Sequence, residues 1–152
     1  MLKTDHIVFP VWRARESLAF YRDVMGLKLV DTYSGADWGG YPGLMMFFVA
    51  SDGREIVLVS LKGAKRPPRD KLARDVRHLA FAESAVAKLA GWRKKLTKAG
   101  IAFWEETHGR QRSLYFEDPN GMVLEITAPP SRPPKRENAK ALAKAEAWMA
   151  RA

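Results

Sequence analysis

The feature that most constrains the fold of this chain is an internal repeat. Asp5-His6-Ile7-Val8-Phe9 precedes an amphipathic segment, residues 17–25, that ends at Gly26. Arg77-His78-Leu79-Ala80-Phe81 precedes a second amphipathic segment, residues 89–99, that also ends at a glycine. Each copy therefore predicts a strand that begins with histidine, a helix, a glycine stop and another strand. The copies are too far apart for a solenoid repeat, so we expect two equivalent modules of one domain.

Both modules are predicted to end in a β-hairpin, which indicates an α+β fold. The first module, about residues 4–61, has predicted strands 4–11 and 27–33, helix 17–25, and hairpin strands 44–50 and 55–61. The second, about 76–128, has predicted strands 76–82 and 101–105, helix 85–99, and hairpin strands 113–117 and 122–127. Residues 62–74, rich in charge and proline, link them. The single domain is thus expected to span residues 1–128.

Residues 129–152 form a separate region. Four prolines stop the sheet, and an alanine-rich basic segment, 136–152, follows as a predicted helix with Leu142, Ala145, Trp148 and Met149 on one side. We expect this helix to pack on its own body or on a neighbouring subunit, in preference to a membrane or a nucleic acid.

Composition limits the partners of the chain. The formal net charge is +9, but the basic residues are spread along the sequence and no nucleic-acid-binding motif is recognisable. No apolar run approaches the roughly 18 residues of a membrane span, and the N-terminus lacks the apolar core of a signal peptide. The chain has no cysteine, which fits a reducing compartment. We therefore expect a cytoplasmic protein that acts on a small molecule, with neither membrane nor nucleic acid as a partner.

The repeat also places a carboxylate opposite the histidines. The final hairpin turns end at Gly53 and Gly121, and four residues further on stand Val57 and Glu125. The four equivalent positions therefore carry histidine, valine, histidine and glutamate. A carboxylate inside the apolar strand 122–127 is costly to bury unless a charge neutralises it.

A divalent metal bound by His6, His78 and Glu125 would neutralise that carboxylate. Two imidazoles and one carboxylate leave two or three coordination positions open, an arrangement typical of non-haem Fe(II) oxygenases and compatible with Mn, Ni, Co or Zn. We therefore expect a divalent metal as cofactor, with Fe(II) favoured. The alternative is that the histidines are ordinary hydrogen-bonded core residues.

The motifs Asp5-His6-Ile7-Val8, residues 19–27, Arg77-His78-Leu79-Ala80-Phe81 and residues 113–125 resemble those of the vicinal oxygen chelate superfamily. This superfamily contains glyoxalases, bleomycin resistance proteins and extradiol dioxygenases. The resemblance covers roughly residues 4–128. It implies two βαβββ modules that form a U-shaped mixed sheet around a metal site, a small-molecule substrate and a homodimer.

Within the superfamily, glyoxalase I has a fourth protein ligand where this chain has Val57. Glu55 shares the face of Val57 but would lie roughly 7 Å along the strand, so whether it reaches the metal stays open. The three-ligand pattern resembles extradiol dioxygenases and fosfomycin-modifying enzymes. In the dioxygenases an active-site tyrosine stands ten residues before the glutamate ligand, which is the spacing of Tyr115 and Glu125. Tyr115 is thus a catalytic candidate, or else a packed residue whose hydroxyl is satisfied by backbone.

His108, on a predicted loop ahead of that strand, is the second catalytic candidate, as a general acid or base. The alternative is a solvent-exposed loop histidine. A glycine- and aromatic-rich loop, residues 34–43, is predicted to be able to fold over the site.

These features predict a metal-dependent enzyme most like a single-domain extradiol-type dioxygenase, an oxidoreductase. A glyoxalase I-like lyase or isomerase is one alternative. A metal-free binding protein like the bleomycin resistance proteins is the other, and the presence of all three ligand types argues against it.

Overall fold

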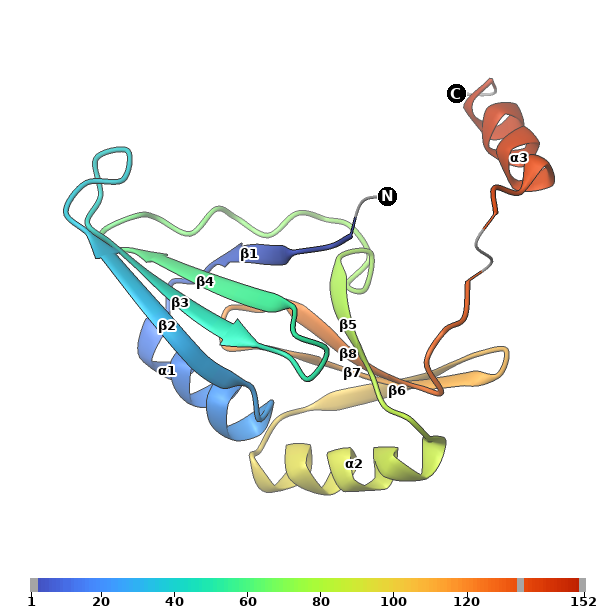
Figure 1. Cartoon of the computed structure of the whole chain (residues 1–152), viewed down its shortest axis with the longest axis horizontal. Coiled ribbons are helices and arrows are strands. Elements are labelled where there is room, and N and C mark those ends of the chain that lie inside the picture. The colour runs from blue at the N-terminus through green and yellow to red at the C-terminus, as the bar shows by residue number, and fades with distance from the viewer. Residues whose placement is uncertain (1–2, 134–135, 151–152) are drawn as a thin grey trace.

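The computed structural model describes residues 3–133 and 136–150, which contain two four-stranded mixed sheets (Figure 1). In each sheet the first and last strands of a module pair in parallel and the remaining pairs are antiparallel. The first sheet has the order β1-β4-β3-β2, with β1 His6–Pro10, β2 Lys28–Gly35, β3 Gly43–Val49 and β4 Glu55–Leu61. The second has the order β5-β8-β7-β6, with β5 His78–Ala82, β6 Phe103–His108, β7 Gln111–Glu117 and β8 Val123–Ala128. The predicted α+β fold of two βαβββ modules is confirmed.

Each module carries one helix between its first two strands. In the first, α1 (Ala14–Ala19) continues as a π-helical segment, Phe20–Val24, and the chain turns at Gly26 with a φ of 74°. In the second, a short 3₁₀ turn leads into α2 (Leu89–Lys98), and Gly100 has a φ of 67°. The glycine stops are where the repeat predicts them. The first helix begins three residues earlier than predicted, because a side chain of the other module holds its start.

The two modules share one apolar core between their sheets. Alternate residues of each sheet, which we call its inner face, point into this core and pack on the helices. The inner faces contribute Met46, Phe48, Ile56 and Leu58 from the first sheet, and Leu114, Phe116, Leu124 and Ile126 from the second. Because both inner faces meet in this core, the opposite, outer faces of the two sheets point away from each other.

The turn between β7 and β8 fastens the second module to α1 of the first. The Asn120 side chain accepts hydrogen bonds from the backbone N–H groups of Trp12 and Arg13, at 2.8 and 3.1 Å, and donates to Ser17 at 2.8 Å. Beside it, the Tyr21 hydroxyl donates to Asp118 at 3.1 Å. Burial, reinforced by the negative charge of Asp118, raises the pKa of Tyr21 above its ordinary value. This buried polar network therefore joins segments about 100 residues apart in the sequence.

The linker between the modules, residues 62–77, folds back onto the second sheet. The Arg66 guanidinium donates to the carbonyl of Asn120. Arg69 and Arg74 both donate to one oxygen of Glu117, at 2.6 and 2.9 Å. The linker, which the sequence predicts only as a charged, proline-rich connection, is thus attached to the second module by three arginine side chains.

The C-terminal helix α3, Ala139–Met149, is capped by Asn138 and stands apart from both sheets (Figure 1). All of its residues are exposed, so it does not pack on the body of its own chain as one of our predictions allowed. The last two residues of the predicted helix lie outside the described part. No helix in the described part is long and apolar enough to cross a membrane.

We predict that Asn120→Ala lowers the free energy of unfolding by about 2 to 4 kcal/mol, because it leaves several buried partners without a hydrogen bond. Urea denaturation followed by circular dichroism measures this. Asn138→Ala is the matched control, because it removes an exposed helix cap outside the shared core and should leave the main transition within about 1 kcal/mol. Equal effects of the two substitutions would contradict the proposed role of Asn120.

Candidate metal site

Two of the three predicted metal ligands meet on the outer face of the second sheet. His78 begins β5 and Glu125 lies in the centre of β8, and His78 Nε2 is 3.0 Å from Glu125 Oε2. The Glu125 side chain is 9% exposed and that of His78 is 33% exposed. A nearly buried carboxylate beside a more open imidazole forms a site that solvent can reach from one side.

The linker determines which nitrogen of His78 is available. His78 Nδ1 lies 2.6 Å from the backbone carbonyl oxygen of Asp75. Because a carbonyl can only accept, Nδ1 must carry the proton and donate it. In the neutral ring the Nε2 lone pair then points toward Glu125. This is the arrangement of a metal-bound histidine, whose second nitrogen usually donates to a carbonyl or carboxylate.

The donor atoms of this pair fit a divalent metal. Two ligands bonded at about 2.1 Å and at right angles to each other have their donor atoms about 3.0 Å apart. The Nε2 to Oε2 separation in the structure is also 3.0 Å. A protonated imidazole paired with the carboxylate gives the same separation, so metal binding by this pair stays a prediction.

His6 does not join the other two predicted ligands. It begins β1 on the outer face of the first sheet, where its side chain is 50% exposed and Nδ1 lies 2.9 Å from Asp5. Among the described residues, no three His, Cys, Asp or Glu side chains come together in a way that could hold a metal ion. The expected three-ligand site is therefore not assembled within one chain.

The strand registers agree with the equivalence derived from the repeat. In the parallel pair of the second module, Ala80 is the partner of Glu125. In the first module, Val8 is the partner of Val57, and Glu55 lies opposite His6. Val57 is thus the structural counterpart of Glu125. Glu55 lies two residues before Val57 on the same face of β4, as predicted.

Tyr115 lies directly beside Glu125, because it is the register partner of Glu125 in β7. Its ring contacts the edge of His78, with ring centroids 5.6 Å apart, and stacks on Trp104 at 5.3 Å. Burial, followed by the charge of Glu125, raises the pKa of Tyr115 to about 12. Tyr115 is thus a protonated phenol at neutral pH, held next to the His78–Glu125 pair.

His108 reaches the same face, contrary to its predicted place on a loop. β6 continues to His108, and only Gly109 and Arg110 separate it from β7. Residues 106–112 are all polar or glycine and therefore suggest a loop, yet Thr107 pairs with Arg112 and His108 with Gln111 up to the turn. His108 Nε2 lies 3.2 Å from the Tyr115 hydroxyl and 3.2 Å from Glu106.

Trp104 and Glu106 are site residues that the sequence reasoning missed. Both precede His108 by even numbers of residues in β6, so all three share the outer face. The Trp104 indole N–H donates to Glu106 at 2.9 Å. Trp104, Glu106 and His108 are alternate residues, and this spacing places them on one face of a strand. It could have been recognised in the sequence only if the predicted strand had been extended to His108.

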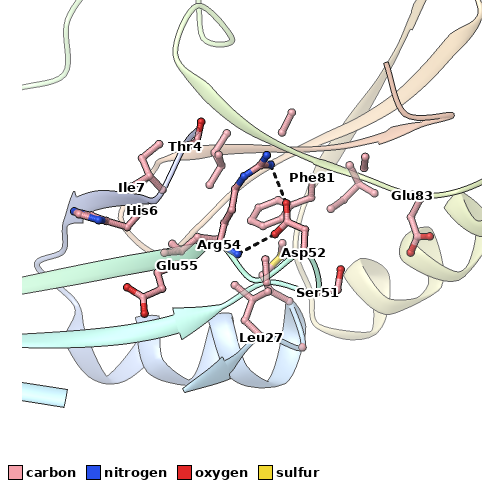
Figure 2. Close-up of a pocket in the computed structure, with 18 of the residues that line it drawn as sticks. Thr4, His6, Ile7, Leu27, Ser51, Asp52, Arg54, Glu55, Phe81 and Glu83 are labelled. Carbon is pink, nitrogen blue, oxygen red and sulfur yellow. Dashed lines mark hydrogen bonds and ion pairs between the residues drawn. The ribbon is translucent and has the colours of Figure 1, made fainter. Parts of the chain in front are cut away.

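A cavity between the two modules lies on the other side of these strands (Figure 2). It has a volume of about 520 Å³ and is lined by inner-face residues of both modules, including Ile7, Phe81 and Ile126. His6 and Glu55 border it, but Figure 2 shows both side chains turned away from Phe81. We call this the inter-module cavity, and it is separate from the His78–Glu125 pair.

The glycine- and aromatic-rich loop, residues 34–43, packs on its own hairpin. The Trp38 ring stacks on Tyr33 of β2, with ring centroids 5.8 Å apart and the ring planes 28° from parallel. Trp38 also lies against Gly43, where a Cβ atom would clash with the indole. Closure of this loop over a site stays a prediction.

A family model described as the Glyoxalase/Bleomycin resistance protein/Dioxygenase superfamily matches residues 3–126. The chain therefore belongs to this superfamily, which is the one predicted from the histidine motifs.

Individual relatives in this superfamily are distant. The glutathione transferase FosA of Serratia marcescens is 25% identical over 124 residues, which is 80% of this chain and 77% of that protein. The glyoxylase/bleomycin resistance protein/dioxygenase domain from Frankia sp. EAN1pec superposes with a TM-score of 0.67 at 23% identity, covering 84% of this chain and 97% of that one. A mutant of the fosfomycin resistance protein FosX of Listeria monocytogenes superposes with a TM-score of 0.65 at 20% identity, covering 86% of this chain and 94% of that one. That structure is a complex with Mn(II) and 1S,2S-dihydroxypropylphosphonic acid. At these identities the structures support the fold alone.

We predict that the Tyr115 phenol ionises only near pH 12. The difference in absorbance at 295 nm between the parent and Tyr115→Phe should therefore emerge only above about pH 11. In a Glu125→Gln background the difference should emerge at lower pH, because the negative charge beside the phenol is gone. An unchanged titration in that background would contradict the contact between Tyr115 and Glu125.

Proposed function

We propose that this chain is a metal-dependent enzyme of the superfamily, whose site is completed by two copies of the chain. His78 and Glu125 of one copy would bind a divalent metal together with His6 of the second copy. The observation that carries this proposal is the pairing of His78 Nε2 with the buried Glu125 carboxylate, with Nδ1 held by a backbone carbonyl.

The exposed edges of the sheets support the role of a second copy. β1 and β5 are edge strands, and within the described part of the chain each pairs on one side only. β1 exposes apolar side chains, with Ile7 37% and Val8 45% exposed. Such edges readily pair with another strand. Pairing β1 of one copy with β5 of another would bring the two outer faces together and form a homodimer.

The residues of the site would divide the chemistry between them. A divalent metal bound there would polarise two neighbouring oxygens of a small substrate as a Lewis acid. The Tyr115 phenol, protonated at neutral pH, can donate a hydrogen bond to negative charge that develops on the substrate. His108, in contact with Tyr115 and Glu106, can accept or return a proton.

Two reaction classes are candidates for this site. The extradiol-type dioxygenase is the first, supported by the position of Tyr115 beside Glu125 and by the two-histidine, one-carboxylate ligand set. Addition to an epoxide is the second, supported by the sequence similarity to FosA. A glyoxalase-like reaction is less well supported, because Val57 occupies the fourth ligand position.

We predict that the purified protein binds about one divalent metal per chain and that His6→Ala, His78→Ala and Glu125→Gln each weaken binding by at least about tenfold. Elemental analysis and Mn(II) titration measure this.

The contribution of a second copy is testable by complementation. A heterodimer of His6→Ala and Glu125→Gln chains should regain one intact site, because His6 of one chain meets His78 and Glu125 of the other. Co-expression with two different affinity tags isolates the heterodimer, and each homodimer is a control. If the heterodimer binds no more metal than the homodimers, the three ligands do not come from two chains.

The reaction class is testable with two assays. We expect oxygen uptake with catechols after loading with Fe(II), or loss of the epoxide of fosfomycin after loading with Mn(II) in the presence of water or glutathione. Tyr115→Phe should lower kcat by about a hundredfold with the metal content unchanged. Activity that survives Glu125→Gln in full would rule out this site as the catalytic centre.

A further inference from the structure

A second cavity lies between the linker and the second sheet. Its volume is about 170 Å³, roughly that of six water molecules. Three arginines of the linker region line it, Arg69, Arg74 and Arg77, and its apolar floor includes Met122 and Val123 at the start of β8. We call it the linker cavity.

The charges around the linker cavity favour an anion. Three guanidinium groups meet two carboxylates, Glu117 and Asp70, so one positive charge remains uncompensated. Arg69 and Arg74 share a single oxygen of Glu117, which leaves most of their N–H groups without a protein acceptor in that contact. Planar guanidinium groups in this number are suited to a tetrahedral or planar oxyanion.

The linker cavity adjoins the candidate metal site. Glu117, Val123 and His78 lie in one row across three neighbouring strands of the outer face. Two strand spacings separate Glu117 from His78, a distance of about 10 Å. Arg74 also lies over the Trp104 ring, 4.6 Å from its centroid, and Trp104 stacks on Tyr115. A small molecule could therefore reach from the arginines to the His78–Glu125 pair.

We propose that the linker cavity binds an oxyanion, such as a phosphate, phosphonate, sulfonate or carboxylate group. Resting on the proposed function, this oxyanion is the charged end of the substrate, held by Arg69 and Arg74 while the other end reaches the metal. In this arrangement Glu117 is the residue that an arriving anion displaces from the two guanidinium groups.

Titration of the full-length, metal-free protein with inorganic phosphate at low ionic strength tests the site. We expect the Arg69→Gln/Arg74→Gln double variant to bind phosphate at least about tenfold more weakly, because it loses two charged donors. Glu117→Gln should bind phosphate more tightly, since it frees both guanidinium groups. Arg93→Gln is the matched control, because Arg93 forms an exposed ion pair with Glu105 outside the cavity and should leave phosphate affinity unchanged.

Several results would overturn the proposal. Unchanged phosphate affinity in the double variant would exclude the two arginines as the binding groups. Weaker phosphate binding by Glu117→Gln would show that the ion pairs serve only to hold the linker. An equal loss in Arg93→Gln would mean that phosphate responds to net charge alone. Circular dichroism and thermal midpoints of each variant establish that it is folded.

The same proteins separate this proposal from the proposed function. Glu125→Gln should lose metal and keep phosphate affinity, whereas the double variant should keep metal and lose phosphate affinity. If no metal binds to the parent protein but phosphate still responds to Arg69 and Arg74, the anion site stands and the metalloenzyme proposal falls. If metal binds to the parent protein and phosphate does not, the metalloenzyme proposal stands and the anion site falls.

Discussion

The shared core between the two inner faces is the constraint on which the rest of the structure depends. Each module buries one face of a four-stranded sheet and one side of a helix, and neither is large enough to form a full core by itself. The buried network around Asn120 fixes how the two modules meet. Once the inner faces are joined in one chain, the outer faces must point apart. The separation of His6 from His78 and Glu125 follows directly from this packing.

This packing also explains why the inter-module cavity and the candidate chemical site lie on different faces. Residues that alternate with His78 and Glu125 along the same strands, such as Phe81 and Ile126, point to the inter-module cavity. The polar groups that can do chemistry are on the outer face of the second sheet, together with the arginines of the linker. The linker belongs to this site as much as the strands do, because it supplies both the carbonyl that orients His78 and the cationic side chains beside it.

Much of this arrangement was predictable from the sequence, because a repeat carries information about equivalent positions. The match of His6 with His78 and of Val57 with Glu125 needed only the glycine turns as a reference, and the strand registers agree with it. A repeat does not reveal which modules face each other, since two equivalent modules can pair either within one chain or between two chains. His108 was misplaced for a different reason. The end of β6 extends into solvent on both faces, so its residues are as polar as those of a loop.

The contact between His78 and the linker has a consequence for how this site can change through evolution. The acceptor is the backbone carbonyl of Asp75, so a substitution of the Asp75 side chain leaves the acceptor in place. An insertion or deletion between Asp75 and His78 would instead move this carbonyl relative to the imidazole. The orientation of the His78 ring is thus encoded in the spacing between Asp75 and His78, and not in the side chain at position 75.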